Sequence, residues 1–293
     1  MHIPDGYLSP ETAAAMYAAA FPFWYRATKK IQVLLTGRLV PTIALFAAFS
    51  FVVMMFNIPL PGGTTGHAVG SSLAAIVLGP WAAVLAVSVA LVIQALFFGD
   101  GGILAIGANV FNMAIAMPFV AYYLYRLIAG NAASNSSRRT MAAGIAGYVA
   151  INVAALLTAI ELGLQPLLFR DAAGHALYFP YGLGVSIPAM LLGHLTIAGA
   201  VEAIVTGLVF AWLARTNPEL IQTGRDTTAA AAHGLSRWVW GALIALVALT
   251  PIGLLAPGTA WGEWGRNELQ NLGLGYIPAG FDQWSSFWNA PLS

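Results

Sequence analysis

The chain has 293 residues, of which 59% are hydrophobic and only 8% are charged. Soluble domains carry about 25% charged residues, so this chain lacks the polar surface that a water-soluble fold needs. With a mean hydropathy of +0.77 it is predicted to be an integral membrane protein that has the lipid bilayer as its surroundings. A formal net charge of +1 excludes a basic surface, and we expect no nucleic-acid partner.

Lysine and cysteine usage excludes further classes of protein. The only lysines are Lys29 and Lys30, so no glycine-rich loop ending in Gly-Lys occurs and the chain carries no P-loop. Any ATP-driven transport would therefore need partner ATPases, and we expect the chain not to be an enzyme. The absence of cysteine leaves histidine, carboxylate and backbone nitrogen as the coordinating groups.

The first apolar run is Thr12–Tyr25, and three positive residues, Arg26, Lys29 and Lys30, follow it. This order is the reverse of a secretory signal peptide, so we expect no cleavage. The positive-inside rule then places Met1 on the extracytoplasmic side of the cell membrane.

The residues before this run are predicted to fold back into the protein. Pro4-Asp5-Gly6 is typical of a turn, and Ser9-Pro10-Glu11 is typical of a helix start. Residues 1–8 should therefore form a short irregular plug.

Further apolar segments follow in alternation with polar or glycine- and proline-rich breaks. Before the predicted linker, positive residues gather at the inner ends, with Arg38, Arg126, Arg138 and Arg139 inside and only Arg170 outside, in the predicted loop Gly163–Tyr181. This topology returns His67 to the side on which the chain begins. The predicted membrane segments are Leu39–Phe56, Ala68–Leu78, Trp81–Phe98, Ile103–Ile128, Met141–Ile160, Val185–Leu213 and Val239–Leu255.

Composition divides the chain into three parts. Residues 1–215 form the expected membrane domain, and residues 216–236 are a polar cytoplasmic linker rich in threonine and alanine. Residues 237–293 should add one last transmembrane helix and an extracytoplasmic tail rich in tryptophan, glycine and proline.

The opening residues Met1 and His2 indicate a transition-metal site. A free amine, an amide nitrogen and an imidazole follow one another closely enough for fused chelate rings, and His67 could fill the remaining planar position. Square-planar nitrogen coordination is diagnostic of Ni(II) or Cu(II). The alternative is that His2 belongs to a disordered terminus and that His67 bonds to the backbone.

The remaining candidate residues lie in or beside the predicted membrane segments, and each group has an alternative interpretation. Gln94, Asp100, Asn109 and Asn112 could support the plug or the metal ligands, or they could be ordinary polar contacts between helices. Ala44 and Ala48 form a small-xxx-small pair that could receive a partner helix, although alanine is common here. His194 and Glu202 share roughly one helix face, and we expect them to pair inside the bundle rather than to form a second metal site.

Several motifs together resemble the NikM/CbiM family, the substrate-binding components of energy-coupling factor transporters for nickel and cobalt. The resemblance covers about residues 1–215, and residues 256–265 are similar to an extension that some members carry. The motifs are Met1–Leu8, Pro61–His67, Gly79-Pro80-Trp81, Phe98–Gly102 and Gly107–Met113.

The resemblance implies the ligands, the fold and the partners. The amine of Met1, the backbone nitrogen and imidazole of His2, and the imidazole of His67 would hold the metal. An all-α fold is implied, with a six-helix core, an extra N-terminal helix and here one additional C-terminal helix. The core would dock through an alanine-rich face, for which Ala44 and Ala48 are candidates, to a transmembrane coupling component with two ATPases. The short extension leaves open the need for a small accessory membrane subunit.

The transported substrate is predicted to be Ni²⁺, because a deprotonated amide favours planar Ni(II). We expect no resident cofactor. Two alternatives are Co²⁺, feeding cobalamin synthesis, and a small organic micronutrient carried by the same fold. An intramembrane hydrolase is disfavoured, since the sequence has neither cysteine nor a His-Glu-x-x-His motif.

Overall fold

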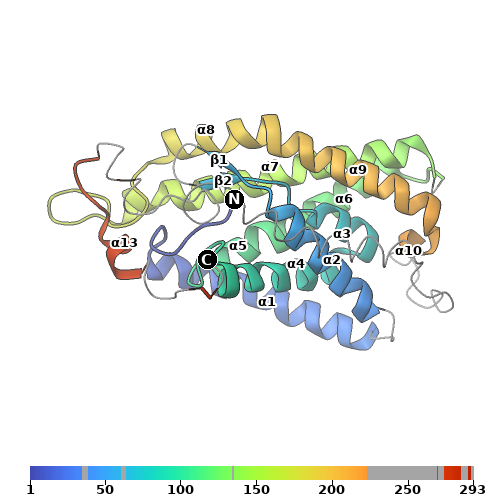
Figure 1. Ribbon diagram of the computed structural model, residues 1–293, viewed down its shortest axis with the longest axis horizontal. Helices are drawn as coiled ribbons and strands as arrows, with labels where there is room; N and C mark the ends of the chain where they lie inside the picture. The colour runs from blue at the N-terminus through green and yellow to red at the C-terminus, as the bar shows by residue number, and fades with distance from the viewer. Residues whose placement is uncertain are drawn as a thin grey trace.

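The computed structural model describes residues 1–34, 39–60, 64–133, 135–222, 269, 274–284 and 290–291. Long helices lie side by side along the longest dimension of the molecule, with α1 (Pro10–Leu34) and the continuous helix of α8 and α9 (Leu183–Thr216) on opposite sides (Figure 1). The expected all-α membrane fold is confirmed.

The described elements are α-helices, π-helical segments (η) and one pair of short strands. In chain order they are α1 (Pro10–Leu34), α2 (Leu39–Met54), β1 (Ile58–Leu60), β2 (Thr64–Gly66), α3 (Ser71–Leu78), α4 (Pro80–Ile93), η1 (Gln94–Phe98), α5 (Ile106–Asn109), η2 (Val110–Ala116), α6 (Met117–Ala129), α7 (Ser137–Leu168), α8 (Leu183–Gly193), η3 (His194–Ala198), α9 (Gly199–Thr216), α10 (Pro218–Gln222) and α13 (Ala279–Trp284).

Four continuous helical segments of the described chain are long and apolar enough to cross a membrane, and α2 is a shorter apolar helix. They carry large apolar side chains on the outside of the bundle: Leu127, Leu192 and Leu208 are each more than 60% exposed. Helices that are hydrophobic on all sides suit a lipid environment. The four segments are Pro80–Phe98, Ile106–Ala129, Ser137–Leu168 and Leu183–Thr216.

Three of these segments contain a π-helical turn, which the sequence did not indicate. Each turn includes a buried polar residue: Gln94 in η1, Asn112 in η2 and His194 in η3. π-Helical turns occur frequently at functional sites because they redirect side chains that a regular helix would place elsewhere.

The structure departs from the sequence predictions at the end of α7 and between α2 and α3. The helix expected to end at Ile160 continues to Leu168, so the outer loop starts later than Gly163. Gln165 explains the extension, because its side chain donates to the Glu161 carbonyl and to Thr12 Oγ1 of α1. In addition, β1 and β2 pair as antiparallel strands with Ile58 opposite Gly66, where only a loop was expected.

The C-terminal third is described only in part. The first residues of the predicted linker form the short helix α10, which packs against α3 and α9. The predicted last membrane segment, Val239–Leu255, and residues 256–265 lie outside the described residues.

The two ends of the bundle differ in charge. The α6–α7 connection, next to Arg126, Arg138 and Arg139, lies at the same end as α10, whereas the α7–α8 loop and α13 lie at the other end (Figure 1). Met1 lies inside the bundle beside the β1–β2 hairpin and not at either surface (Figure 1).

Candidate metal centre

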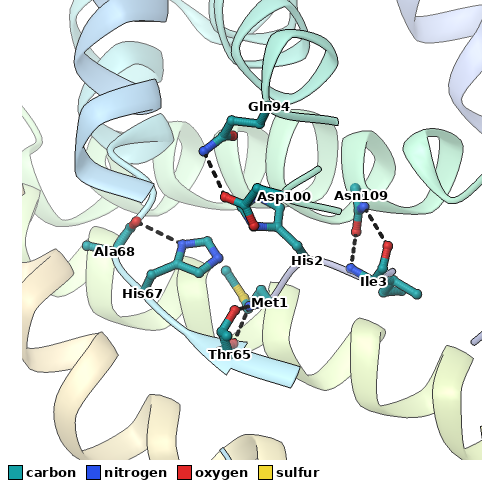
Figure 2. A network of polar contacts seen from close by, with 9 residues as sticks. All are labelled: Met1, His2, Ile3, Thr65, His67, Ala68, Gln94, Asp100 and Asn109. Atoms are coloured by element: carbon teal, nitrogen blue, oxygen red, sulfur yellow. Dashed lines mark hydrogen bonds and ion pairs between the residues drawn. The ribbon is translucent and has the colours of Figure 1, made fainter. Parts of the chain in front are cut away.

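The first three residues are buried in the interior of the bundle. Met1, His2 and Ile3 are each 0% exposed, although chain termini are usually among the least ordered parts of a protein. Asn109 holds this segment with two hydrogen bonds: the Ile3 N–H donates to Asn109 Oδ1 at 2.8 Å, and Asn109 Nδ2 donates to the Ile3 carbonyl at 3.2 Å (Figure 2). The predicted fold-back of the chain start is confirmed.

Asp5 bonds the turn that contains it to the residues just before α5. Its carboxylate oxygens accept hydrogen bonds from the Leu104 N–H at 2.8 Å and the Ile103 N–H at 3.0 Å. Burial raises the pKa of Asp5, and these backbone hydrogen bonds act in the opposite direction. Gly102 permits the close approach, because a Cβ atom at this position would collide with Asp5.

The amine of Met1 reaches strand β2. It donates to the carbonyl of Thr65 and, at 3.3 Å, to Thr65 Oγ1 (Figure 2). Because His67 comes two residues after Thr65, the hairpin brings the start of the chain next to this histidine. Thr65 was not singled out from the sequence, since its contribution is mainly a main-chain carbonyl.

The imidazoles of His2 and His67 stack on one another. Their ring centroids are 4.6 Å apart and the rings are inclined by 23°. Both side chains are buried, with His67 only 1% exposed. Two residues far apart in the sequence therefore bring their ring nitrogens into one interior space (Figure 2).

The protonation state of His67 is set by its surroundings. Its Nδ1 lies 3.0 Å from the Ala68 carbonyl, which can only accept, so Nδ1 carries the proton and Nε2 keeps its lone pair. Nε2 is buried and has no hydrogen-bond partner among the described residues. Burial lowers the pKa of His67 well below 6.5, and repulsion from the Met1 ammonium and from His2 lowers it further. The ring is thus neutral and suited to bind a cation.

A buried carboxylate orients the other imidazole. Asp100 Oδ1 lies 2.7 Å from His2 Nδ1, and Gln94 Nε2 donates to Asp100 Oδ2 at 3.2 Å (Figure 2). Asp100 is 2% exposed. A chain of Gln94, Asp100 and His2 therefore fixes the ring, as carboxylates commonly do beside metal-bound histidines.

Half of the nitrogens gathered at this centre are main-chain groups. Within the described residues, no cluster of three or more His, Cys, Asp or Glu side chains is arranged to hold a metal ion. The nitrogens gathered here are instead the Met1 amine, the His2 amide and two imidazoles. Chelation by such a set suits a divalent ion that accepts planar nitrogen ligands.

The structure separates the four polar residues singled out beside the ligands. Gln94, Asp100 and Asn109 lie at the centre, whereas Asn112 donates to Thr158 Oγ1 at 3.1 Å and to Glu161 Oε2 at 2.9 Å on α7. Asn112 therefore joins two helices and does not contact His67 or the chain start.

His194 and Glu202 do not form the expected pair. His194 Nδ1 lies 2.7 Å from the Met190 carbonyl of its own helix. Glu202 accepts instead from the backbone amides of Val69 and Gly70, just after His67. Sequence spacing alone could not reveal this, because the partners of Glu202 are main-chain groups of a distant segment.

The described part of the C-terminal tail covers the chain start. The Tyr7 ring packs edge-on against Phe281 of α13 at 4.8 Å and lies 5.6 Å from the Phe179 ring. The Phe179 N–H donates to the Tyr7 carbonyl at 3.1 Å. α13 and the α7–α8 loop thus cover Tyr7.

The alanine pair of α2 lies on the outer side of its helix. Ala44 is exposed and Ala48 is partly exposed, while Phe46 and Ala47 are buried. This placement is compatible with contact to lipid or to a neighbouring helix.

Comparison with known proteins decides the family. Residues 2–220 match the family described as the cobalt uptake substrate-specific transmembrane region. The chain belongs to this family. The NikM/CbiM resemblance of the sequence motifs is thereby confirmed, and with it nickel and cobalt transport proteins as relatives.

Similar proteins share most of the chain. The fused nickel transport protein NikMN of Rhodobacter capsulatus is 53% identical over 100% of this chain and 87% of its own length. The probable fused nickel transport protein LarMN of Lactiplantibacillus plantarum is 48% identical over 92% of this chain and 80% of its own length. A solved structure described as a transition metal transporter is 53% identical in sequence and aligns with a TM-score of 0.72. The alignment covers 79% of this chain and 100% of the solved one.

Proposed function

We propose that this chain binds Ni²⁺ with high affinity as the substrate-binding membrane component of an energy-coupling factor transporter. One observation carries the proposal: the buried amine of Met1, held by Thr65, and the stacked rings of His2 and His67 share one interior space. A polar group without a partner in such surroundings is costly, and a cation would engage His67 Nε2.

The proposed ligands are four nitrogens. The Met1 amine and the His2 amide would close a five-membered ring with the ion, and His2 Nδ1 would close a six-membered ring with the same amide. Asp100 Oδ1 lies 2.7 Å from the same Nδ1 in this structure, so His2 would release this contact and turn its ring to bind the ion through Nδ1. His67 Nε2 would complete the plane.

Nickel is favoured over cobalt by ligand type. An amide nitrogen and three further nitrogens suit planar four-coordinate Ni(II), and two similar proteins are named as nickel transporters. Co²⁺ is the second candidate, because the family is named for cobalt uptake. Cu²⁺ would bind such a set more tightly than either ion, so its exclusion must depend on availability.

The proposed assembly follows from the resemblance to the NikM/CbiM family, which implies a transmembrane coupling component and two partner ATPases that drive transport. The sequence has no P-loop, in agreement with ATP hydrolysis by partners. Ala44 and Ala48 are the proposed docking face. Residues 1–215 would bind the metal with the chain start outside the cell membrane, residues 216–236 would be a cytoplasmic linker, and residues 237–293 would add a further helix and an outer tail. A small accessory membrane subunit is a further candidate partner.

Metal titration of the purified full chain tests the proposal. We expect one Ni²⁺ per chain and the absorbance of diamagnetic planar Ni(II), with weaker binding of Co²⁺. His2→Ala and His67→Ala should each abolish the planar signal, whereas His175→Ala, in an exposed loop, should leave it unchanged. A component for an organic micronutrient would tolerate His2→Ala and bind no Ni²⁺, and that result would refute the proposed function.

A further inference from the structure

Glu202 is a completely buried acidic residue of α9 that lies against the segment following His67. Its Oε2 accepts the Val69 N–H at 2.8 Å and the Gly70 N–H at 3.0 Å. Thr206, one turn further along α9, donates to Oε1 at 3.3 Å. Glu202 is 0% exposed, and it is the acceptor in all three of these hydrogen bonds.

These contacts supply acceptors for two amides just before α3, those of Val69 and of the N-cap residue Gly70. The first N–H groups of a helix have no partner within that helix and need one from outside. Gly70 adopts a left-handed conformation with φ +73°, and an added Cβ at this position would collide with Phe49. The turn between His67 and α3 is therefore tightly constrained, and Glu202 holds it from the neighbouring helix.

One peptide unit connects Glu202 to the His67 ring. The Ala68 carbonyl contacts His67 Nδ1 at 3.0 Å, and the N–H of the same peptide unit, that of Val69, donates to Glu202. A peptide unit is planar and rigid, so fixing its N–H also fixes the direction of its carbonyl. Hydrogen bonds in such a chain polarise and strengthen one another.

We propose that Glu202 is a positioning residue for the metal ligand His67 and acts through the Ala68–Val69 peptide unit. It holds the carbonyl that keeps the proton on Nδ1, and so keeps the Nε2 lone pair directed at the metal centre. This inference rests on the proposed function, because it assigns a role within the same centre.

Two substitutions distinguish position from charge. Glu202→Gln keeps an oxygen that can accept both amides and places its NH₂ beside Thr206, whose hydroxyl can accept. Glu202→Asp keeps the carboxylate but is one methylene shorter, so it cannot reach the amides without moving α9. A role in positioning predicts that Gln is tolerated and Asp is not, whereas a role of the negative charge predicts the reverse.

The experiment is titration of Ni²⁺ into the purified full chain, with the absorbance of planar Ni(II) recorded. Glu161→Asp is the matched control, because Glu161 is a mostly buried acidic residue of α7 that accepts from Asn112, away from His67. We expect Glu202→Asp to weaken Ni²⁺ binding about tenfold or more and to shift the absorbance, while Glu202→Gln and Glu161→Asp stay within about threefold of the unaltered chain.

A second measurement separates positioning from general destabilisation. In a His67→Ala background the planar signal is lost but the nitrogens of Met1 and His2 remain, so the weaker Ni²⁺ binding is measured by calorimetry. Glu202→Asp should cause no further loss of affinity there, because the ligand that Glu202 positions is absent. A misfolded protein would lose affinity in both backgrounds, and that result overturns the inference.

The other outcomes are equally decisive. Equal affinities of Glu202→Asp and the unaltered chain, or losses in Glu202→Gln as large as those in Glu202→Asp, overturn the role of Glu202 alone. If neither the unaltered chain nor Glu161→Asp binds Ni²⁺, the proposed function itself fails and this inference with it.

Discussion

Asn109 pairs with both polar groups of Ile3, accepting from its N–H and donating to its carbonyl as a neighbouring strand would. We expect Asn109→Ala to leave the buried Ile3 N–H without its partner, whereas the Ile3 carbonyl still accepts from the Gly102 N–H at 2.9 Å. The expected cost is about 1–3 kcal/mol, or about five- to 150-fold in Ni²⁺ affinity. Titration of the purified chain measures the loss. Asn112→Ala, three residues along, removes a contact to α7 and should leave the affinity unchanged; equal effects of the two would contradict the assignment.

Blocking the chain start should abolish Ni²⁺ binding. One extra residue before Met1 converts its amine into an amide and must also fit where Met1 is 0% exposed. Intact-mass measurement verifies which residue comes first, and calorimetry then compares the extended chain with one that carries the same residue at its other end. An extended chain that still binds Ni²⁺ tightly would show that the amine is not a ligand.

Asp100→Asn should weaken Ni²⁺ binding by about ten- to 100-fold, as is usual for partners of metal-bound histidines. The substitution removes the carboxylate that lies 2.7 Å from His2 and the charge that would stabilise a cation in this buried centre. Asp171→Asn is the matched control, since Asp171 contacts His175 at 3.3 Å in an exposed loop. Unchanged affinity in Asp100→Asn would contradict a role for this contact.

Acid should weaken Ni²⁺ binding, because every coordinating nitrogen must be free of its competing proton. The lowered pKa of His67 keeps this ring neutral at pH 7, so its protonation opposes the ion only well below 6.5. The amine, with an ordinary pKa of about 7.7–8.0, is expected to compete at higher pH. Titrations from pH 8 to pH 5 should therefore show a steadily rising dissociation constant, and a flat profile would rule out nitrogen ligation.

The sequence predicted the long membrane helices because their apolar runs are long and charges mark one end. The alternation of apolar segments with polar breaks predicted that His67 lies on the same side of the membrane as Met1, and the structure brings these residues together. Helix ends were less predictable: Gly163 looked like a boundary, yet Gln165 continues the helix through side-chain contacts to Glu161 and Thr12.

Contacts through main-chain groups were beyond sequence reasoning. Thr65 presents a carbonyl, and the partners of Glu202 are the amides of Val69 and Gly70, so no side-chain pattern marks either contact. The β1–β2 hairpin was missed because its prolines and glycines are typical of a loop. The π-helical turns also leave no mark in the hydrophobic pattern, although they carry Gln94 and His194.

The contact between Tyr7 and Phe281 sets an order on biosynthesis. Tyr7 is made long before α13, so this contact can form only after the membrane segments between them have been synthesised. Phe179 of the α7–α8 loop, which also packs on Tyr7, is made earlier than α13. The Tyr7 ring is therefore covered in two steps, first by the α7–α8 loop and then by α13.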